Sequence, residues 1–366
     1  MKEFTPILKI LQAVITDDEL NNILNTLGYQ DKGRILTVGV FFKYLLLSAI
    51  LKSDGYRELH TQGVQYGLPK VDYSTLSKKA KEIPFEIFLY ICNHILAKSN
   101  RTTRRKMDPV ISRMVAAIDS TCITAHKNKL PWAPYLKESS GIKYHVKFAV
   151  DSKLPIQVIP SVIHTGDAEK LPEFRDNNNI LVCDRGYRNI AKLCELDFKG
   201  QEFVVRLKDN ITMLNQIPFD IQHEEGYTDV LCTLGKDRAL KKEYRCHQFR
   251  VIKFVGNGGK TVMLCTNIID LSAEVIAEIY RKRWSIECFF RTLKQNFSIK
   301  KVFGTTMNAV YSQGLIAFIA YVLTYCSYTK LKFRGKYNDT FHNFLRCLRS
   351  NSLRLHWKVF CNSLLP

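Results

Sequence analysis

The sequence predicts an α/β protein whose mixed-sheet core is interrupted by an all-β segment and flanked by helical regions at both ends. Apolar residues recur at helical spacing in residues 1–106 and again from Met307 onward. Between these regions, short apolar runs alternate with turn residues, as is typical of strands. With 366 residues, 46% of them hydrophobic, the chain is large enough to bury a sizeable core.

The N-terminal region, residues 1–106, is expected to form a small helical bundle. Within it, Tyr56–His60 and Asp72–Lys81 are expected to be two short helices joined by a glycine-containing connection. A second helix rich in Ser, Thr and Lys is typical of a DNA-binding helix-turn-helix. Such helical pairs also occur in bundles that bind nothing, so the pattern leaves both interpretations open. Arg101–Lys106 is expected to be a basic linker.

The core is predicted from five strand-like apolar runs, at residues 114–118, 141–150, 154–163, 179–183 and 202–208. Asp151-Ser-Lys153 is expected to be a hairpin turn between the second and third runs, and a helix is expected from Arg188 to about Leu196. Three antiparallel strands followed by a strand, a helix and a strand give the order of a ribonuclease H-like sheet.

An all-β insertion is predicted before the last core helix. Tyr244–Val255 and Thr261–Asn267 flank Gly256–Gly259, which is a hairpin signal and lacks the frame of a phosphate-binding loop. One helix is expected from Asp270 or Ser272 to about Asn296. The predicted division is a DNA-binding domain (1–106), the first part of the core (107–208), the β-rich insertion (209–265), the core helix (266–305) and a helical C-terminal region (306–366).

Composition favours a nucleic acid as the partner. Lys and Arg outnumber Asp and Glu by 54 to 34, giving a formal net charge of +20 that is spread along the chain. The 11 cysteines include no C-x-x-C pair, which argues against disulfides or a zinc ribbon and favours a reducing cytoplasm. The most apolar run, Gly314–Cys326, is short for a bilayer and is expected to be a buried helix, so no membrane is expected as a partner.

Three acidic residues are candidates for metal-dependent phosphodiester chemistry. Asp119 and Asp184 each follow an apolar run directly, and Glu287 lies on the predicted long helix. Carboxylates from separate elements can hold two divalent cations that activate the attacking oxygen and stabilise the leaving one. Hard oxygen ligands suit Mg²⁺ or Mn²⁺. An aspartate after a strand is also a common turn former or helix cap. For Asp167, loop chemistry is the preferred interpretation.

His145 is expected to be a satisfied sheet histidine, although a polar partner of the site stays open.

The helix around Glu287 carries a charged stripe. On a continuous helix, Tyr280, Arg283, Glu287 and Lys294 fall at about 0°, 300°, 340° and 320°. Taken alone, this stripe could equally be an ordinary exposed helix face, on which Glu287 and Arg291 form an i,i+4 pair.

These four positions follow the pattern Y-x2-R-x3-E-x6-K, which resembles the signature of the DDE transposases of insertion sequence family 4. Ile118-Asp119-Ser120 and Val182-Cys-Asp184-Arg-Gly186 extend the resemblance, which spans about residues 110 to 300. It implies that Asp119, Asp184 and Glu287 bind the catalytic metals, as two Mg²⁺ or Mn²⁺ ions per active site. It also implies that Tyr280, Arg283 and Lys294 contact DNA near the cleaved phosphate.

The resemblance further implies cut-and-paste transposition by a bacterial, cytoplasmic enzyme that associates with the nucleoid when bound to DNA. Water would cleave double-stranded DNA at the terminal inverted repeats, and the freed 3′ hydroxyl would attack target DNA within a homodimeric synaptic complex. Some family members hold a flipped base with a tryptophan of the insertion, but Trp132, Trp284 and Trp357 all lie outside residues 209–265. Two alternatives stay open: a catalytically silent DNA-binding derivative, and a ribonuclease H-like nuclease without strand transfer.

Overall fold

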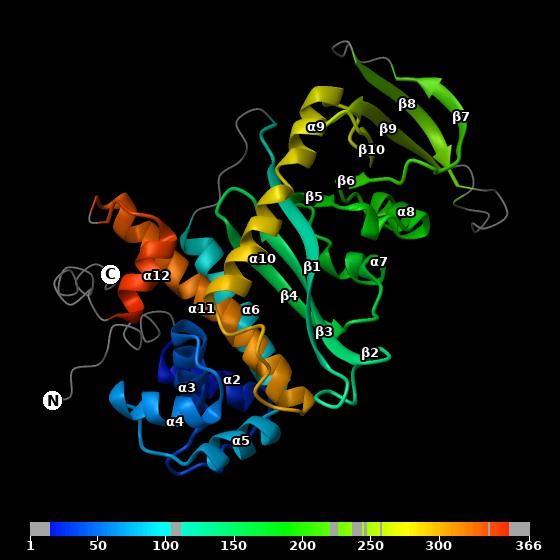
Figure 1. Cartoon of the computed structure of the whole chain (residues 1–366). Helices are drawn as coiled ribbons and strands as arrows, with labels where there is room; N and C mark the ends of the chain where they lie inside the picture. The colour runs from blue at the N-terminus through cyan, green and yellow to red at the C-terminus, as the bar shows by residue number, and fades with distance from the viewer. Residues whose placement is uncertain are drawn as a thin grey trace. The chain divides into compact units, whose positions relative to one another are not determined.

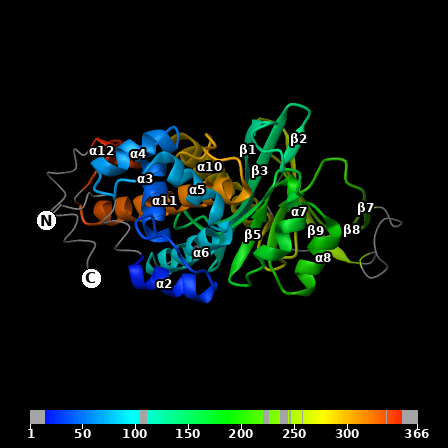
Figure 2. The ribbon, with the colours of Figure 1, turned by 90° about the horizontal axis from the view of Figure 1, so that it is seen from below.

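The computed structural model describes residues 15–103, 111–219, 226–235, 244, 247–256, 258–335 and 337–350 (Figures 1 and 2). The chain divides into two compact units. Unit 1 comprises Met1–Thr103, Cys122–Ile142 and Phe290–Pro366, and unit 2 comprises Arg104–Thr121 and Lys143–Phe289. The five-part functional division expected from the sequence stays a prediction.

Unit 1 is mainly helical, as predicted. Its helices are α2 (Asp17–Thr26), α3 (Val38–Leu51), α4 (Tyr56–Gln65), α5 (Tyr73–Glu82), α6 (Phe85–Thr102), α11 (Met307–Phe333) and α12 (Phe341–Arg349). Helix α11 packs against α3, α5 and α6. By length and composition α11 could cross a membrane, but 89% of its most apolar 18-residue window is buried inside the protein, as in the core helix of a bundle.

The two short helices expected at Tyr56–His60 and Asp72–Lys81 are confirmed as α4 and α5, which pack against each other. The Asp72 carboxylate caps α5 by accepting a hydrogen bond from the Ser74 amide at 2.7 Å. Gly63 is needed for close packing, because a Cβ there would lie 2.0 Å from the Tyr44 ring. The expected basic linker is wrong at its start, since Arg101 lies in the last turn of α6. Residues 104–106 lie outside the described part of the chain.

A mixed sheet forms the centre of unit 2. Its strands are β1 (Met114–His126), β3 (Ser139–Ala149), β4 (Leu154–Val162), β5 (Asn179–Cys183), β6 (Phe203–Arg206), β7 (Met213–Pro218), β8 (Tyr227–Leu234), β9 (Gln248–Val255) and β10 (Thr261–Thr266). Their order is β3-β1-β5-β6-β10-β9-β8-β7, and β4 pairs with the outer side of β3. The last residues of β1 and the first of β3 belong to unit 1, together with the short strand β2 (Pro134–Leu136).

Strand directions confirm the ribonuclease H-like core. The turn between β3 and β4 is only four residues long, so these neighbours are antiparallel. The Val150 amide donates to the Val115 carbonyl at one end of the β1–β3 pair, and the Lys127 amide donates to the Glu138 carbonyl at the other, which is an antiparallel arrangement. Strands β1, β5 and β6 are parallel to one another.

The all-β segment continues this sheet. Strand β10 is antiparallel to β6 on one side and to β9 on the other. The predicted glycine-rich hairpin is confirmed: Val255 pairs with Thr261, and Gly258 has a φ of +83°, which favours glycine. The insertion therefore lengthens the core sheet at the edge formed by β6.

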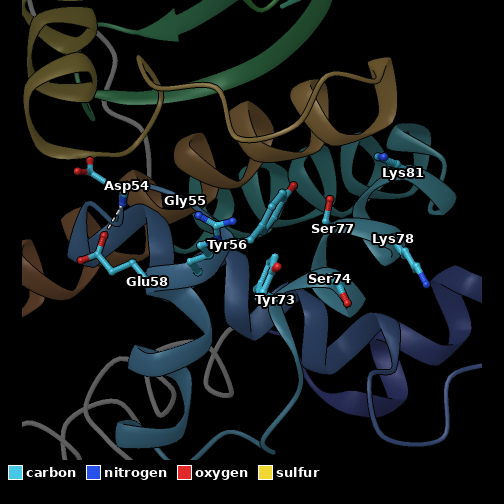
Figure 3. Close-up of a pocket in the computed structure, with 10 residues that line it drawn as sticks. Asp54, Gly55, Tyr56, Glu58, Tyr73, Ser74, Ser77, Lys78 and Lys81 are labelled. Atoms are coloured by element: carbon cyan, nitrogen blue, oxygen red, sulfur yellow. Dashed lines mark hydrogen bonds between the residues drawn. The ribbon is translucent and has the colours of Figure 1, made fainter.

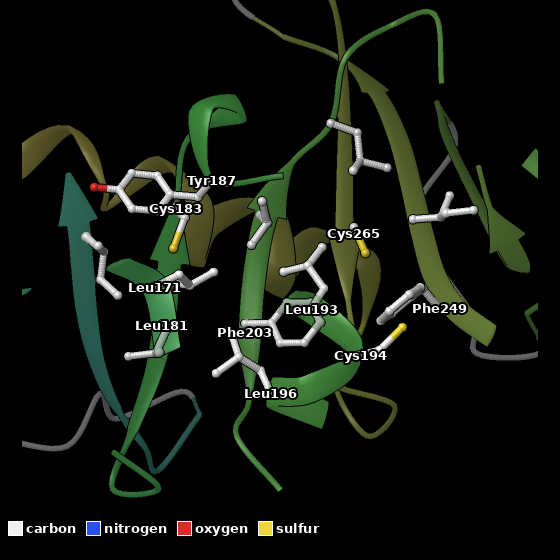
Figure 4. Close-up of a cluster of buried hydrophobic side chains, with 14 of the residues drawn as sticks. Leu171, Leu181, Cys183, Tyr187, Leu193, Cys194, Leu196, Phe203, Phe249 and Cys265 are labelled. Carbon is white, nitrogen blue, oxygen red and sulfur yellow. The ribbon is translucent and has the colours of Figure 1, made fainter. Parts of the chain in front are cut away.

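Helices cover both faces of the sheet. Alternate residues of β5 divide between two apolar clusters, with Leu181 and Cys183 in one and Ile180 and Val182 in the other. The first cluster, drawn in Figure 4, includes residues of α8 (Ile190–Phe198), and Figure 2 shows α8 on the same side of the sheet as α7 (Asp167–Lys170). The second includes residues of α9 (Ala273–Arg281), drawn in yellow in Figure 1.

Two predicted element boundaries are wrong. Strand β1 does not stop before Asp119 but continues to His126, because Thr121, Ile123 and Thr124 favour extended structure. The long helix expected up to Asn296 is divided into α9 and α10 (Trp284–Asn296).

Candidate active site

The sheet brings Asp119 and Asp184 to the same level. Ile118 and Cys183 are partners in the parallel β1–β5 pair, and the two aspartates are the residues that follow. Because side chains alternate across a sheet, Asp119 shares the face of Val115, which belongs to the cluster beneath α9. The predicted convergence of two strands on one site therefore follows from the register.

Asp184 begins a tight turn. The carboxylate is the N-cap of a 3₁₀ turn over Arg185–Tyr187, and its Oδ1 accepts a hydrogen bond from the Gly186 amide at 2.8 Å. Asp184 is half-buried, whereas Gly186 is exposed. The carboxylate is therefore fixed by its own turn at the end of β5.

The junction of α9 and α10 sets the direction of Arg283. Here the Arg283 amide donates to the Tyr280 carbonyl at 3.0 Å, and the Ser285 amide donates to the Lys282 carbonyl at 3.1 Å. These i→i−3 hydrogen bonds wind the chain more tightly than an α-helix. The stripe predicted on a continuous helix is thus bent at Lys282 and Arg283.

The Arg283 guanidinium lies between two of the candidate carboxylates. One terminal nitrogen is 3.5 Å from Asp119 Oδ2, and the other donates to Glu287 Oε1. The guanidinium carbon lies 5.8 Å from the centroid of the Tyr280 ring. The Arg283 side chain is only 13% exposed. Arg283 therefore joins β1 to α10 through charge-assisted contacts.

The electrostatics of the site centre on Asp119. The pKa of its carboxyl is raised to about 7, mainly by burial and also by the negative charges of Asp184 and Glu287, whereas the Ser120 amide and Arg283 act to lower it. Burial lowers the pKa of Arg283, but its contacts with Glu287, Tyr280 and Asp119 outweigh burial, so that the net shift is upward. Three mutually repelling carboxylates thus share one neighbourhood with a single partly compensating cation.

Carboxylate oxygens have the donor chemistry that a hard divalent cation requires, and a cation would relieve the repulsion that raises the pKa of Asp119. Across the described residues, however, no three His, Cys, Asp or Glu side chains are arranged closely enough to hold a metal ion. Arg283 contacts Asp119 and Glu287, two of the carboxylates that would hold such an ion. The residue types fit a divalent metal, and occupancy would require Arg283 to shift.

The site therefore gathers Asp119, Tyr280, Arg283 and Glu287 through direct contacts, with Asp184 acting on Asp119 through its charge. Lys294 is half-buried on the part of α10 that belongs to unit 1.

Sequence reasoning missed a buried network beside Asp184 that comprises Lys143, His145 and Asp167. The one available signal was the alternation of Lys143, His145 and Lys147 along an otherwise apolar strand.

Comparisons with known proteins agree on one family. The Transposase DDE domain family matches residues 112–323. The "Probable transposase for insertion sequence element IS5377" of Geobacillus stearothermophilus is 35% identical over 363 residues, which cover 98% of this chain and 94% of that protein. The "Putative transposase for insertion sequence element IS4SA" of Synechocystis is 26% identical over 274 residues, covering 69% and 71% of the two chains.

Among solved structures, the piggyBac transposase synaptic complex with hairpin DNA is similar with a TM-score of 0.49 and 12% identity, covering 100% of this chain and 86% of that one. A likeness of that size carries no argument. The family match covers more than half of the chain, and the Geobacillus relative covers nearly all of it. The chain therefore belongs to the DDE transposases of bacterial insertion sequences.

Proposed function

We propose that this transposase moves its own insertion sequence by cut-and-paste, with Asp119, Asp184 and Glu287 as the catalytic carboxylates. The observation that carries this proposal is the contact of Arg283 with both Asp119 and Glu287, beside the Asp184 turn. That arrangement unites three separate elements in one acidic, partly covered site. The active site would cleave double-stranded DNA at the terminal inverted repeats and then join the 3′ ends to target DNA.

Enzymes of this family use divalent metal ions. In the proposal, Asp119, Asp184 and Glu287 hold two Mg²⁺ or Mn²⁺ ions, which supply activation of the attacking oxygen and stabilisation of the leaving one. Arg283 is suited to bind a phosphate oxygen, since its Nε is buried and has no hydrogen-bond partner within the described residues. Tyr280 supports the guanidinium with its ring, and Lys294 adds a positive charge.

The α4–α5 pair of unit 1 is proposed to bind the ends of the element. A groove of about 600 Å³ runs between these helices, and its lining residues are Asp54, Gly55, Tyr56, Arg57, Glu58, Tyr73, Ser74, Ser77, Lys78 and Lys81. Figure 3 shows Ser74, Ser77 and Lys78 along α5, away from Asp54 and Glu58. The Arg57 guanidinium carbon lies 5.1 Å from the Tyr73 ring centroid. Hydroxyls and lysines along one helix are typical phosphate contacts.

The remaining partners follow from the same proposal. The two ends of one element must be held together before they are joined to a target, and a homodimer would supply one active site for each end. The working place of the enzyme would be the bacterial cytoplasm, with association to the nucleoid through bound DNA.

The proposal is tested with Glu287→Gln, which removes the charge and keeps the size. The substrate is a DNA fragment carrying the sequences that flank the reading frame of this protein, in the presence of Mg²⁺. Glu278→Gln is the matched control, because Glu278 lies on α9 in an exposed ion pair with Arg281. We expect E287Q to lose cleavage by at least about a thousandfold and E278Q to cleave like the parent.

Parental cleavage by E287Q would refute the catalytic assignment. The products separate the alternatives: cleaved ends that never become joined to target DNA indicate a nuclease without strand transfer. Specific end binding by the unaltered protein without any metal-dependent cleavage indicates a silent DNA-binding derivative.

A further inference from the structure

The Asp184 turn is flanked by a second carboxylate, Asp167. A Cβ added to Gly186 would lie 3.0 Å from Asp184 Oδ1 and 3.5 Å from Asp167 Oδ2, so the two carboxylates approach the same glycine. Gly186 does not have a positive φ. A side chain at this position would be tight against Asp184 and in ordinary contact with Asp167, without any strain from an unusual backbone conformation.

Asp167 is itself held by side chains of β3. Lys143 Nζ lies 3.1 Å from Asp167 Oδ1 and also donates to the Thr165 carbonyl at 3.0 Å. His145 Nδ1 lies 3.4 Å from the same carboxylate oxygen, and its Nε2 is 2.9 Å from Ser161 Oγ. Lys143 is 8% exposed and His145 is fully buried. Because the lysine side of this ion pair is covered, although the Asp167 side chain is 27% exposed, water screens the attraction only in part, and Lys143 restrains Asp167.

Tyr187 closes the turn from the apolar side. Its ring packs in the cluster that Figure 4 shows, and its hydroxyl, although buried, has no hydrogen-bond partner within the described residues. Burial raises the pKa of the Tyr187 phenol, and the charges of Asp167 and Asp119 raise it further. The hydroxyl is therefore within electrostatic reach of both carboxylates.

We propose that Asp167, held by Lys143, is a positioning residue that fixes the Asp184 carboxylate for metal binding. The Asp184–Gly186 turn is closed by its own hydrogen bond, and Asp167 Oδ2 lies on the other side of Gly186, 3.5 Å from where a Cβ would stand. Groups that orient a metal-binding carboxylate tune its affinity without touching the ion. This inference rests on the proposed role of Asp184 as a metal-binding residue.

The test measures Mn²⁺ binding to the full-length protein by electron paramagnetic resonance, without DNA and therefore without catalysis. We expect Asp167→Asn to weaken Mn²⁺ binding by about 10- to 100-fold per folded molecule. Gly186→Ala, at an exposed position, should weaken it as well, because the new Cβ would lie 3.0 Å from Asp184 Oδ1 and push that carboxylate slightly out of place. Thermal melting reports whether each variant is folded, and G186A decides the matter if D167N does not fold.

A matched control lies on the same strand. Lys147 and Asp176 form a second buried Lys–Asp pair at 3.4 Å, but Asp176 is beside Asn179 at the start of β5, at the opposite end from Asp184. Asp176→Asn should leave Mn²⁺ affinity unchanged within about twofold. An equal loss in D167N and D176N would reduce the effect to general destabilisation and overturn the proposal, as would parental affinity in folded D167N or G186A.

Lys143→Met separates positioning from direct coordination. If Asp167 positions Asp184, loss of Lys143 frees Asp167 and weakens Mn²⁺ binding. If Asp167 is itself a ligand for which Lys143 competes, the same variant binds Mn²⁺ more tightly, and the positioning role is wrong. Asp184→Asn tests whether Asp184 binds the metal at all. If D184N binds Mn²⁺ like the parent, the proposed function is wrong. If D184N loses affinity but D167N does not, only the proposed role of Asp167 is wrong.

Discussion

Arg283 contacts Asp119 and Glu287 with its two terminal nitrogens, so a strand and a helix of the candidate site are joined by one guanidinium. In the metal-free protein this cation offsets part of the repulsion between the carboxylates, and it competes with any divalent ion for the same oxygens. The two roles have opposite consequences for metal binding and for catalysis.

Arg283→Gln should therefore tighten Mn²⁺ binding by at least about tenfold, because a competing charge only 3.5 Å from Asp119 is removed. DNA cleavage should fall in the same variant, since the proposed phosphate contact is lost. Arg283→Lys retains the charge and is the control, with metal affinity close to that of the parent. Titration calorimetry with Mn²⁺ and a cleavage assay give the two readings, and weaker metal binding by R283Q would contradict the competition.

The raised pKa of Asp119 leads us to expect a particular dependence of stability on pH when metal is removed with EDTA. Its pKa is about 7 in the folded protein and 3.8 ordinarily, so between these values the folded state binds more protons than the unfolded state. The free energy of unfolding should then decrease as pH rises from about 4 to 7, by at most about 4 kcal/mol from this group. Urea unfolding of the parent and of Asp119→Asn between pH 4 and 7 measures this contribution. If the two proteins show the same dependence of unfolding free energy on pH, the carboxyl titrates normally and the prediction is wrong.

The lowered pKa of His145 leads us to expect the opposite change of unfolding free energy with pH. Burial lowers its pKa to about 4 from 6.5, while Asp167 and Glu173 raise it and Lys143 and Lys170 lower it. Between pH 4 and 6.5 the unfolded chain binds more protons, so stability should increase with pH by up to about 3 kcal/mol from this group. His145→Gln cannot titrate and should lack this contribution. If the parent and H145Q unfold with the same pH dependence, His145 has an ordinary pKa.

The packing of Phe289 indicates how the first part of α10 is held on the sheet. Its ring stacks on Phe148 of β3, with centroids 4.8 Å apart and an interplanar angle of 25°, and it is 3% exposed. Phe289→Ala should lower the free energy of unfolding by about 3–5 kcal/mol, because it removes a buried ring and leaves a cavity. Cys288→Ala, at the exposed neighbouring position, is the control and should change stability little. Equal stability of the two variants would show that this stack does not secure α10.

The groove between α4 and α5 predicts a change in salt dependence. Lys78→Gln and Lys81→Gln should each reduce the slope of log affinity against log salt by about one unit, because each lysine that neutralises a phosphate releases a counterion. Lys98→Gln removes the same charge from α6, where Lys98 is paired with Glu19 at 2.9 Å, and should leave the slope unchanged. Equal slopes in all four proteins, measured by fluorescence anisotropy with end DNA, would exclude the groove as the contact surface.

The sequence predicts the core strands well because each of them carries its own local signal, whereas no individual strand is predicted at β7 and β8 of the insertion. At β5 the apolar run, the following Asp184 and the nearby Gly186 all marked the same boundary. At β1 the polar Asp119 predicts the end of the strand, but Asp119 lies inside the strand and is followed by β-branched residues. A polar residue that faces a site looks the same in sequence as one that faces a turn.

The site was less accessible to sequence reasoning because its geometry depends on contacts between distant residues. No glycine or proline marks the bend at Lys282 and Arg283, which is recorded only in the i→i−3 hydrogen bonds. Asp167 was assigned to a loop, because its partners Lys143 and His145 lie more than 20 residues earlier and only the β3–β4 hairpin brings them back. The catalytic roles of Asp119, Asp184 and Glu287 stay predictions until the variants are measured.

The discontinuity of the two units bears on how the protein is made. The chain passes from one unit to the other after Thr103, Thr121, Ile142 and Phe289, so neither unit is a continuous piece of sequence. During synthesis, unit 2 lacks its last residues until Phe289 has left the ribosome, and unit 1 lacks α11 until later still. A chain that terminates before Phe289 would therefore lack residues of both units, and one that terminates between Phe289 and Met307 would contain all of unit 2 but lack α11 of unit 1.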